Sequence, residues 1–330
     1  MSEKILVTGS TGFIGARLLQ YLAGEGTRVR VLLRPESTGD ALPGTVEIAR
    51  GSYLDKQALG QAVKGVNRII HLAGVTKALD EAGYDAGNIM PAGNLLAAVQ
   101  KENPGLQRFL FVSSLAAAGP AAEGIKGVSE SDDPRPVSAY GRSKLRAEEL
   151  CFDNAGDVPV TVVRPPAVYG PGDRDILQVF QMLAKGVLVS PGDVMRQRFS
   201  MIHVDDLVRG IMMAARSDKT AGSTYYITSP AALSWNDVIE AARPVLGFKK
   251  LHTISLPKQL VFLAGFMAGA AGTLSRKPSI INRDKAYELV QDYWVCQSIQ
   301  ARLDFDFEAE IPLEEGIAKT ITWYRNKGWM

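Results

Sequence analysis

The feature that most constrains the fold of this chain is a short apolar run followed at once by three evenly spaced glycines. Residues Lys4–Thr8 (KILVT) have the composition of a buried strand, and the turn at 8–15 (TGSTGFIG) leads directly into a helical pattern. Gly9 permits a tight turn, Gly12 lets the backbone approach a pyrophosphate, and Gly15 lets helix and strand pack closely. Glycines at this spacing in a first strand-to-helix turn predict dinucleotide binding at the helix N-terminus.

The first half of the chain alternates β-branched runs with helical patterns. Strands are expected at 4–8, 28–33, 46–49, 68–72, 109–113 and 160–163, and helices around 13–23, 56–63, 95–100 and 143–152. Because the strands are nearly all apolar, they predict a parallel sheet covered on both faces. Right-handed crossovers then make this a doubly wound α/β sheet, the Rossmann fold.

The second half of the chain is less regular. Apolar segments at 200–204 and 224–227 can rejoin the sheet, whereas most of the sequence after residue 229 has helical patterns. We therefore expect a dinucleotide-binding domain made of residues 1–170 and 201–228. A smaller, mostly helical substrate lobe is expected from 171–200 and 229–330, with the ligand site in the cleft between the two.

Composition excludes several classes of function. The 330 residues carry a net charge of +2, two cysteines and three histidines, so we expect no nucleic-acid partner and no metal site. Both cysteines, Cys151 and Cys296, are expected to be buried apolar residues. A strand pattern that begins at residue 4 predicts no signal peptide, and we expect a cytoplasmic protein.

The residue after the second strand indicates which dinucleotide is preferred. In NAD-binding folds an acidic residue there holds the ribose 2′-hydroxyl, but this chain has Arg34. A planar, always charged guanidinium suits a 2′-phosphate. We therefore expect NADP to be preferred over NAD. The alternative is that Arg34 is a solvated loop residue.

Three side chains form a candidate catalytic constellation. Tyr140 and Lys144 are four residues apart in a helical pattern, which places them on one helix face. A lysine cation beside a phenol lowers the pKa of the phenol from about 10 toward neutrality, so that the tyrosine can exchange a proton with a substrate hydroxyl. Ser114 follows the fifth strand, at the sheet edge where ligands bind, and can bond the same substrate oxygen.

These motifs resemble those of the extended short-chain dehydrogenase/reductase superfamily, the NAD-dependent epimerase/dehydratase family. The matching segments span nearly the whole chain: TGSTGFIG at 8–15, HLAG at 71–74, VSS at 112–114, YGRSK at 140–144, RPPAVYGPG at 164–172 and IHVDDL at 202–207. The resemblance implies a nicotinamide cofactor whose ribose is bonded by Lys144. It implies a cofactor site made by Gly9, Thr11, Gly12, Phe13, Ile14, Gly15, Arg34, Tyr53, Leu72, Ala73, Gly74, Tyr140, Lys144, Pro165 and Val168.

Other positions narrow the chemistry. Sugar dehydratases of this branch have an Asp-Glu pair after the catalytic serine or threonine, whereas this chain has Leu115-Ala116, so dehydration is disfavoured. His203 is expected to pack rather than to catalyse. Asp205 or Asp206 is expected to be a helix N-cap.

Three functions stay open from the sequence. The leading one is an oxidoreductase that interconverts a hydroxyl and a ketone on a small, apolar substrate, because the chain is similar to dihydroflavonol-reductase-like and 3β-hydroxysteroid-dehydrogenase-like members. The second is a nucleotide-sugar epimerase with a tightly bound NAD, in which Arg174, Arg196 and Arg198 are available to hold a diphosphate. The third is a nucleotide-sensing protein without catalysis, although such relatives tend to lose the tyrosine or the lysine.

Two further expectations concern partners. The resemblance implies a homodimer through a four-helix bundle built from the helices around 94–100 and 143–152, with Leu95, Leu96, Val99, Leu145 and Leu150 as the apolar stripe. The segment 259–275 contains no charged residue and is bracketed by Lys258 and Arg276-Lys277. It is interpreted as a buried or dimer-facing helix, as an apolar lid or peripheral membrane contact, or as a membrane span.

Overall fold

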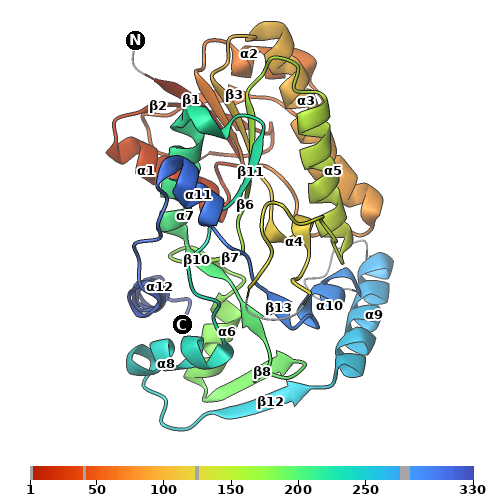
Figure 1. Ribbon diagram of the computed structural model, residues 1–330, viewed down its shortest axis with the longest axis vertical. Helices are drawn as coiled ribbons and strands as arrows, with labels where there is room; N and C mark the ends of the chain where they lie inside the picture. The colour runs from red at the N-terminus through yellow and green to blue at the C-terminus, as the bar shows by residue number, and fades with distance from the viewer. Residues whose placement is uncertain (1–2, 40–41, 123–125, 276–282) are drawn as a thin grey trace.

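The computed structural model describes residues 3–39, 42–122, 126–275 and 283–330 (Figure 1). Its centre is a seven-stranded sheet with the order β11-β6-β5-β4-β1-β2-β3, in which every neighbouring pair is parallel. These strands are β1 (Lys4–Thr8), β2 (Arg28–Leu33), β3 (Glu47–Arg50), β4 (Arg68–His71), β5 (Arg108–Val112), β6 (Val160–Arg164) and β11 (Ser223–Tyr226). The predicted doubly wound fold is confirmed, and the order reverses between β1 and β4.

Helices cover both faces of the sheet because side chains alternate along each strand. Ile5 and Val7 of β1 pack with α1 and α7, whereas Leu6 packs with α2, α3 and α5. Figure 1 shows α1, α7 and α11 on one side of the sheet and α2, α3 and α5 on the other. Their bounds are α1 (Phe13–Gly24), α2 (Lys56–Val63), α3 (Glu81–Glu102), α5 (Ala139–Asp153), α7 (Val204–Arg216) and α11 (Ile299–Phe305).

The second lobe has its own core, in which Phe180, Ile317 and Tyr324 are fully buried. The strands outside the large sheet form two-stranded parallel pairs, β7 with β10, β8 with β12 and β9 with β13. The remaining elements are α4 (Leu115–Ala118), β7 (Ala167–Tyr169), α6 (Leu177–Ala184), β8 (Val187–Pro191), β9 (Arg198–Phe199), β10 (Met201–His203), a 3₁₀ turn (Asp218–Thr220), α8 (Trp235–Leu246), β12 (His252–Leu256), α9 (Lys258–Ser275), α10 (Arg283–Leu289), β13 (Tyr293–Trp294) and α12 (Leu313–Asn326).

The division of the chain between the lobes stays a prediction. Ala301, Phe305 and Phe307 lie in the core beneath the sheet, together with residues of α1 and α7. We therefore propose that residues 299–307 belong to the dinucleotide-binding domain, although the predicted boundary places them in the substrate lobe. Among the helices that the structure describes, none combines the length and the apolarity that crossing a membrane requires.

Three of the five residues of the predicted dimer stripe have a different role within the subunit. α3 begins at Glu81, well before the expected position, and packs along α5. Leu95, Leu96 and Val99 are at most 1% exposed, because they fill the core between these helices and the sheet. These three side chains therefore cannot form a two-fold interface, and the prediction that they do is wrong. The homodimer itself remains a prediction, which the mass in solution tests.

The start of α7 also differs from expectation. The helix begins at Val204, and His203 is its N-cap, with Nδ1 accepting a hydrogen bond from the Asp205 N–H at 3.3 Å. Asp205 instead pairs with Arg17 of α1, and Asp206 accepts hydrogen bonds from the backbone of 310 and 311. The expectation that an aspartate caps this helix is therefore wrong. Both carboxylates tie α7 to neighbouring segments.

A buried ion pair fixes α5 against the sheet. Arg164, the last residue of β6, places Nη2 2.6 Å from Glu148 Oε2 and Nε 3.0 Å from Oε1. Both side chains are under 10% exposed. Ser113 also donates a hydrogen bond to Glu148, and Arg164 Nη1 donates one to the Tyr226 hydroxyl at 3.1 Å. Each charged group therefore has several hydrogen bonds, the condition under which a buried pair is tolerated.

Arg164→Met should destabilise the protein strongly, because it leaves the Glu148 carboxylate buried without its partner. The expected loss in free energy of unfolding, measured by chemical denaturation, is about 3–5 kcal/mol. Replacing both residues with apolar ones of similar size should restore part of it. Arg302→Met is the matched control, since Arg302 and Glu308 form an exposed pair, and it should cost no more than about 1 kcal/mol. Equal losses from both single variants would contradict this role of the buried pair.

Candidate active site

The glycine turn has the geometry of a phosphate cradle. Gly9 has φ +69°, and a Cβ there would lie 2.7 Å from Ala73 N. A Cβ on Gly15 would lie 2.2 Å from Gly9 O. Both positions therefore exclude any larger residue. Gly12 is the N-cap of α1, which has no side-chain cap and no acidic residue in its first turn, so its N–H groups are free for an anion. These residues fit a dinucleotide pyrophosphate.

The other residues of the turn differ in their exposure, and their roles toward a cofactor stay predictions. Thr11 is exposed, whereas Phe13 and Ile14 are partly buried. Phe13 lies near Gly172, where a Cβ would be 3.5 Å from the ring, so the turn touches the segment that leads into the second lobe. Ser10 is buried, and its hydroxyl has no hydrogen-bond partner among the described residues.

The loops after four adjacent strands meet at one edge of the sheet. Gly9 follows β1 and contacts the backbone of Leu72 and Ala73, which follow β4. Gly74 comes next, and a Cβ there would lie 3.5 Å from Lys144 Nζ. After β5 and β6, Leu115 N donates to Pro165 O at 2.8 Å. The predicted cofactor and catalytic residues therefore line one continuous edge, beyond the carboxyl ends of the strands.

Three other predicted cofactor residues have identifiable surroundings. Arg34 is exposed directly after β2, with Nε 3.4 Å from a carboxylate oxygen of Glu36. Tyr53 is partly buried with its ring edge toward His71, and burial raises its pKa to about 12. Val168 is partly buried against the core beneath the sheet. Their roles toward a cofactor stay predictions.

Ser114 lies close to Tyr140. It is the N-cap of α4, where its Oγ accepts a hydrogen bond from Ala116 N at 3.1 Å. Burial raises the pKa of Tyr140 above its ordinary value, although the nearby Ser114 side chain opposes that shift. The tyrosine is therefore protonated at neutral pH, so it is able to donate a proton.

Lys144 lies on the same helix but bonds elsewhere. Its Nζ donates to Val112 O at 2.8 Å and lies 4.6 Å from the centre of the Phe111 ring. Burial lowers the pKa of Lys144 to about 8. The prediction that this lysine lowers the pKa of Tyr140 is not confirmed. The Lys144 ammonium instead donates to the carbonyl of Val112 at the end of β5. Burial of the phenol has the largest effect on the pKa of Tyr140 and raises it. The ammonium does face Gly74, on the side where the resemblance places the nicotinamide ribose.

Two acidic residues of α10 hold the start of α5, and no local sequence pattern indicates this role. Asp284 accepts hydrogen bonds from the backbone N–H groups of Ala139 and Tyr140. Glu288 accepts one from the Ser138 hydroxyl at 2.6 Å, while that hydroxyl caps Gly141. Both carboxylates thus lie at the positive N-terminus of the helix that carries Tyr140. Their spacing of four residues predicts that Asp284 and Glu288 share one helix face. It does not predict that this face contacts the start of α5.

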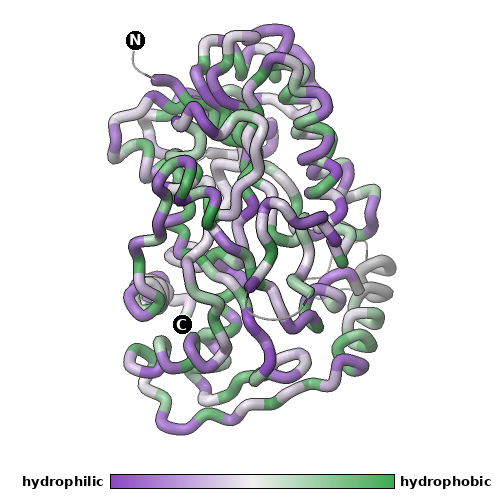
Figure 2. Tube along the Cα trace, viewed as in Figure 1, coloured by the Kyte–Doolittle hydropathy of each residue, from purple (hydrophilic) through white to green (hydrophobic). Residues whose placement is uncertain are grey.

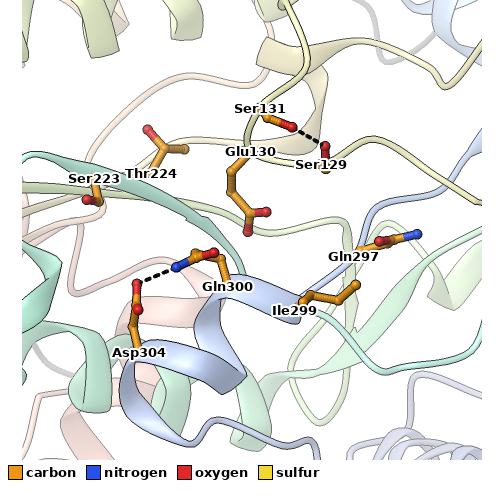
Figure 3. Close-up of a pocket in the computed structure, with 9 residues that line it drawn as sticks. All are labelled: Ser129, Glu130, Ser131, Ser223, Thr224, Gln297, Ile299, Gln300 and Asp304. Atoms are coloured by element: carbon orange, nitrogen blue, oxygen red, sulfur yellow. Dashed lines mark hydrogen bonds between the residues drawn. The ribbon is translucent and has the colours of Figure 1, made fainter.

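A polar cavity of about 550 Å³ lies apart from this constellation (Figure 3). It is lined by Glu130, by Ser223 and Thr224 at the start of β11, and by residues of α11. Ser114 follows the carboxyl end of β5, whereas this cavity lies beside the beginning of the edge strand. It is therefore not the site of the predicted reaction.

The fold and this site define a nicotinamide-dependent enzyme of the extended short-chain type. The chain belongs to the NAD-dependent epimerase/dehydratase family, whose model matches residues 5–228. Known members use NAD or NADP, so a nicotinamide dinucleotide is the cofactor class of this protein.

Named relatives include both reductases and epimerases. The chain is 30% identical to a ceramide reductase of Caulobacter vibrioides, over 99% of this chain and 96% of that one. It is 30% identical to a 3β-hydroxysteroid dehydrogenase/Δ5→4-isomerase of Mycobacterium tuberculosis, over 74% and 68% of the two chains. The solved UDP-glucuronic acid 4-epimerase of Bacillus cereus, in complex with NAD, shares the fold with a TM-score of 0.78 at 22% identity, over 98% and 99%.

Asp284→Asn should impair the reaction through the position of α5. The amide loses the charge and one acceptor oxygen at the first turn, so we expect a stability loss of about 0.5–2 kcal/mol. Misplacement of Tyr140 should lower kcat by about 10- to 100-fold, while the affinity for cofactor stays unchanged. Asp237→Asn, which weakens the cap of α8 far from the site, is the control. If both variants lost turnover equally, Asp284 would have no positioning role.

Proposed function

We propose that this protein is a reductase that uses NADPH to convert a ketone into a hydroxyl on a substrate with a long apolar portion. The observation that carries the proposal is the similarity to a ceramide reductase, which extends over 99% of this chain. In the structure, Leu115 and Ala118 of α4 form a buried apolar cluster with Tyr226 and Cys296 directly after Ser114.

The named relatives support the same substrate class. The ceramide reductase matches almost end to end, and its name describes reduction of a lipid. The dehydrogenase of Mycobacterium tuberculosis is named for a steroid, which is also apolar. The similarity to the Bacillus cereus epimerase is below 25% identity and supports the fold alone.

The proposed mechanism assigns one role to each residue. Gly9, Gly12 and the N-terminus of α1 hold the pyrophosphate, and Lys144 bonds the nicotinamide ribose. The nicotinamide, when bound, supplies the hydride. Ser114 donates a hydrogen bond to the ketone oxygen, and Tyr140 transfers its proton to that oxygen as the alcohol forms. Apolar residues around α4 exclude water, which strengthens both hydrogen bonds.

The epimerase alternative has less support from the second lobe. Arg198 donates hydrogen bonds to the backbone oxygens of Met195 and Gln197, and Arg174 lies 4.8 Å from the centre of the Trp329 ring. Two of the three arginines that were candidates to hold a nucleotide diphosphate are therefore engaged within the protein. The sensor alternative has less support, since such relatives tend to lose the tyrosine or the lysine and this chain retains both Tyr140 and Lys144.

We also propose a cytoplasmic location. Cys151 and Cys296 are free thiols, at most 5% exposed, and free thiols are typical of proteins in reducing compartments. Burial raises the pKa of both thiols to about 12, so neither is a thiolate at neutral pH and neither is reactive.

The substrate class is tested by following NADPH oxidation with long-chain ketones, steroid ketones, flavonoid-like ketones and UDP-sugars. We expect net oxidation with the first two groups and neither oxidation nor epimerisation with UDP-sugars. Tyr140→Phe should lower turnover by about 10²–10⁴-fold and leave cofactor affinity unchanged. Tyr21→Phe, which removes a phenol from the far end of α1, should be neutral. A Tyr140→Phe enzyme with full turnover would overturn the mechanism.

Arg34→Ala tests the cofactor preference. Charge-assisted hydrogen bonds contribute roughly 1.5–3 kcal/mol, so the variant should lose about 10- to 100-fold in NADPH affinity and little in NADH affinity. Arg28→Ala, also exposed and on the same strand, should change neither. Titration calorimetry of the wild type that gave equal affinities for the two cofactors would reject the preference for NADPH.

A further inference from the structure

The helix α9 carries an apolar stripe that faces solvent. Leu260, Leu263, Phe266 and Met267 are between 52% and 64% exposed. With Ala264, which is also exposed, positions 260, 263, 264 and 267 have the i, i+3, i+4, i+7 spacing of a single helix face. In soluble proteins that face normally points into the core. Figure 2 shows the hydrophobic colouring of this helix at the edge of the molecule.

The opposite face of α9 is the one that packs within the subunit. Val261 is buried with Ala286 and Val290 in a small separate core, and the rings of Phe262 and Tyr287 meet edge to face at 5.2 Å. These contacts attach α9 to α10 and fix which face is outward. Within the described parts of the chain, the stripe is therefore exposed to solvent, whereas the opposite face of α9 packs on α10.

Basic residues flank this stripe in the sequence. No charged residue lies between 259 and 275, and the sequence supplies Lys258 before it and Arg276-Lys277 after it. Lys258 is the first residue of α9, and its Nζ lies 3.3 Å from Asp292. The strand β12 leads directly into this start of α9 (Figure 1).

We propose that α9 docks this protein on an anionic phospholipid bilayer, with its stripe among the acyl chains and Lys258 among the headgroups. Apolar residues on one face with basic residues flanking them in the sequence are the pattern of interfacial helices. A second copy of the chain is the alternative occupant, and the oligomeric state distinguishes it in the test below.

The docking surface is one helix away from the active site. α10, which packs on α9, also supplies Asp284 and Glu288 to the N-terminus of α5, beside Tyr140. A lipid that left the bilayer at α9 would therefore meet the catalytic constellation after crossing a single helix. This inference rests on the proposed function for the identity of the substrate, because a lipid ketone would be held in the membrane that α9 contacts.

The test is flotation of the full chain with vesicles of phosphatidylcholine alone or with added phosphatidylglycerol. We expect binding to the anionic vesicles that weakens as salt is raised. The double substitution Leu263→Glu and Met267→Glu should lower the partition coefficient by roughly tenfold or more. The matched control is Ile299→Glu with Leu303→Glu, which also alters two exposed apolar residues four apart on a helix, and it should bind as the wild type does.

Two results would overturn the proposal. One is failure of the wild type to bind anionic vesicles, or equal binding by wild type and the α9 variant. The other is a dimer that does not bind vesicles and becomes monomeric with the α9 substitutions, which would assign the stripe to a second copy. Vesicle binding needs no turnover, so failure of the proposed reaction on soluble ketones would leave this result intact. Conversely, ketone reduction without vesicle binding would remove only the docking surface.

Discussion

The buried pair of Glu148 and Arg164 is the interaction on which the rest of the site depends. Arg164 ends β6 and Glu148 lies one turn beyond Lys144 on α5, so the pair fixes the catalytic helix to the carboxyl edge of the sheet. Ser113 donates to the same carboxylate from the end of β5. Because charges this buried are tolerated only with specific hydrogen bonds, the helix has one favourable position. That position places Tyr140 against Ser114.

The other end of α5 is held by a different part of the chain. Asp284 and Glu288 of α10 contact its first turn, while Lys144 bonds a carbonyl of β5 near its middle. The helix that carries two of the candidate catalytic residues is therefore restrained by the sheet on one side and by α10 on the other.

Local patterns in the sequence predict much of this structure. Apolar strands alternate with helices, and the glycine turn and Ser114 each follow a strand, which predicts that they lie at the same edge of the sheet. The spacing of Tyr140 and Lys144 predicts that they share a helix face. Tertiary contacts set the rest. The cap of α7 by His203 and the carboxylates of α10 could not be predicted, because nothing local specifies which distant segment supplies a partner. The hydrogen bond from Lys144 to Val112 O cannot be predicted from local sequence, because it depends on how closely α5 packs on the sheet.

Ketone reduction and sugar epimerisation both transfer a hydride between the nicotinamide and a carbon atom of the substrate. They differ in the source of the hydride that the product carries, which is NADPH in a reductase and the substrate itself in an epimerase. The most direct measurement is mass spectrometry of the product formed from NADPH that carries deuterium at the transferable position of the nicotinamide. For a reductase acting on an apolar ketone, the label appears on the new hydroxyl-bearing carbon, in amounts equal to the NADP⁺ produced. Unlabelled, isomerised substrate with no net oxidation of NADPH would contradict the account and assign the site to an epimerase.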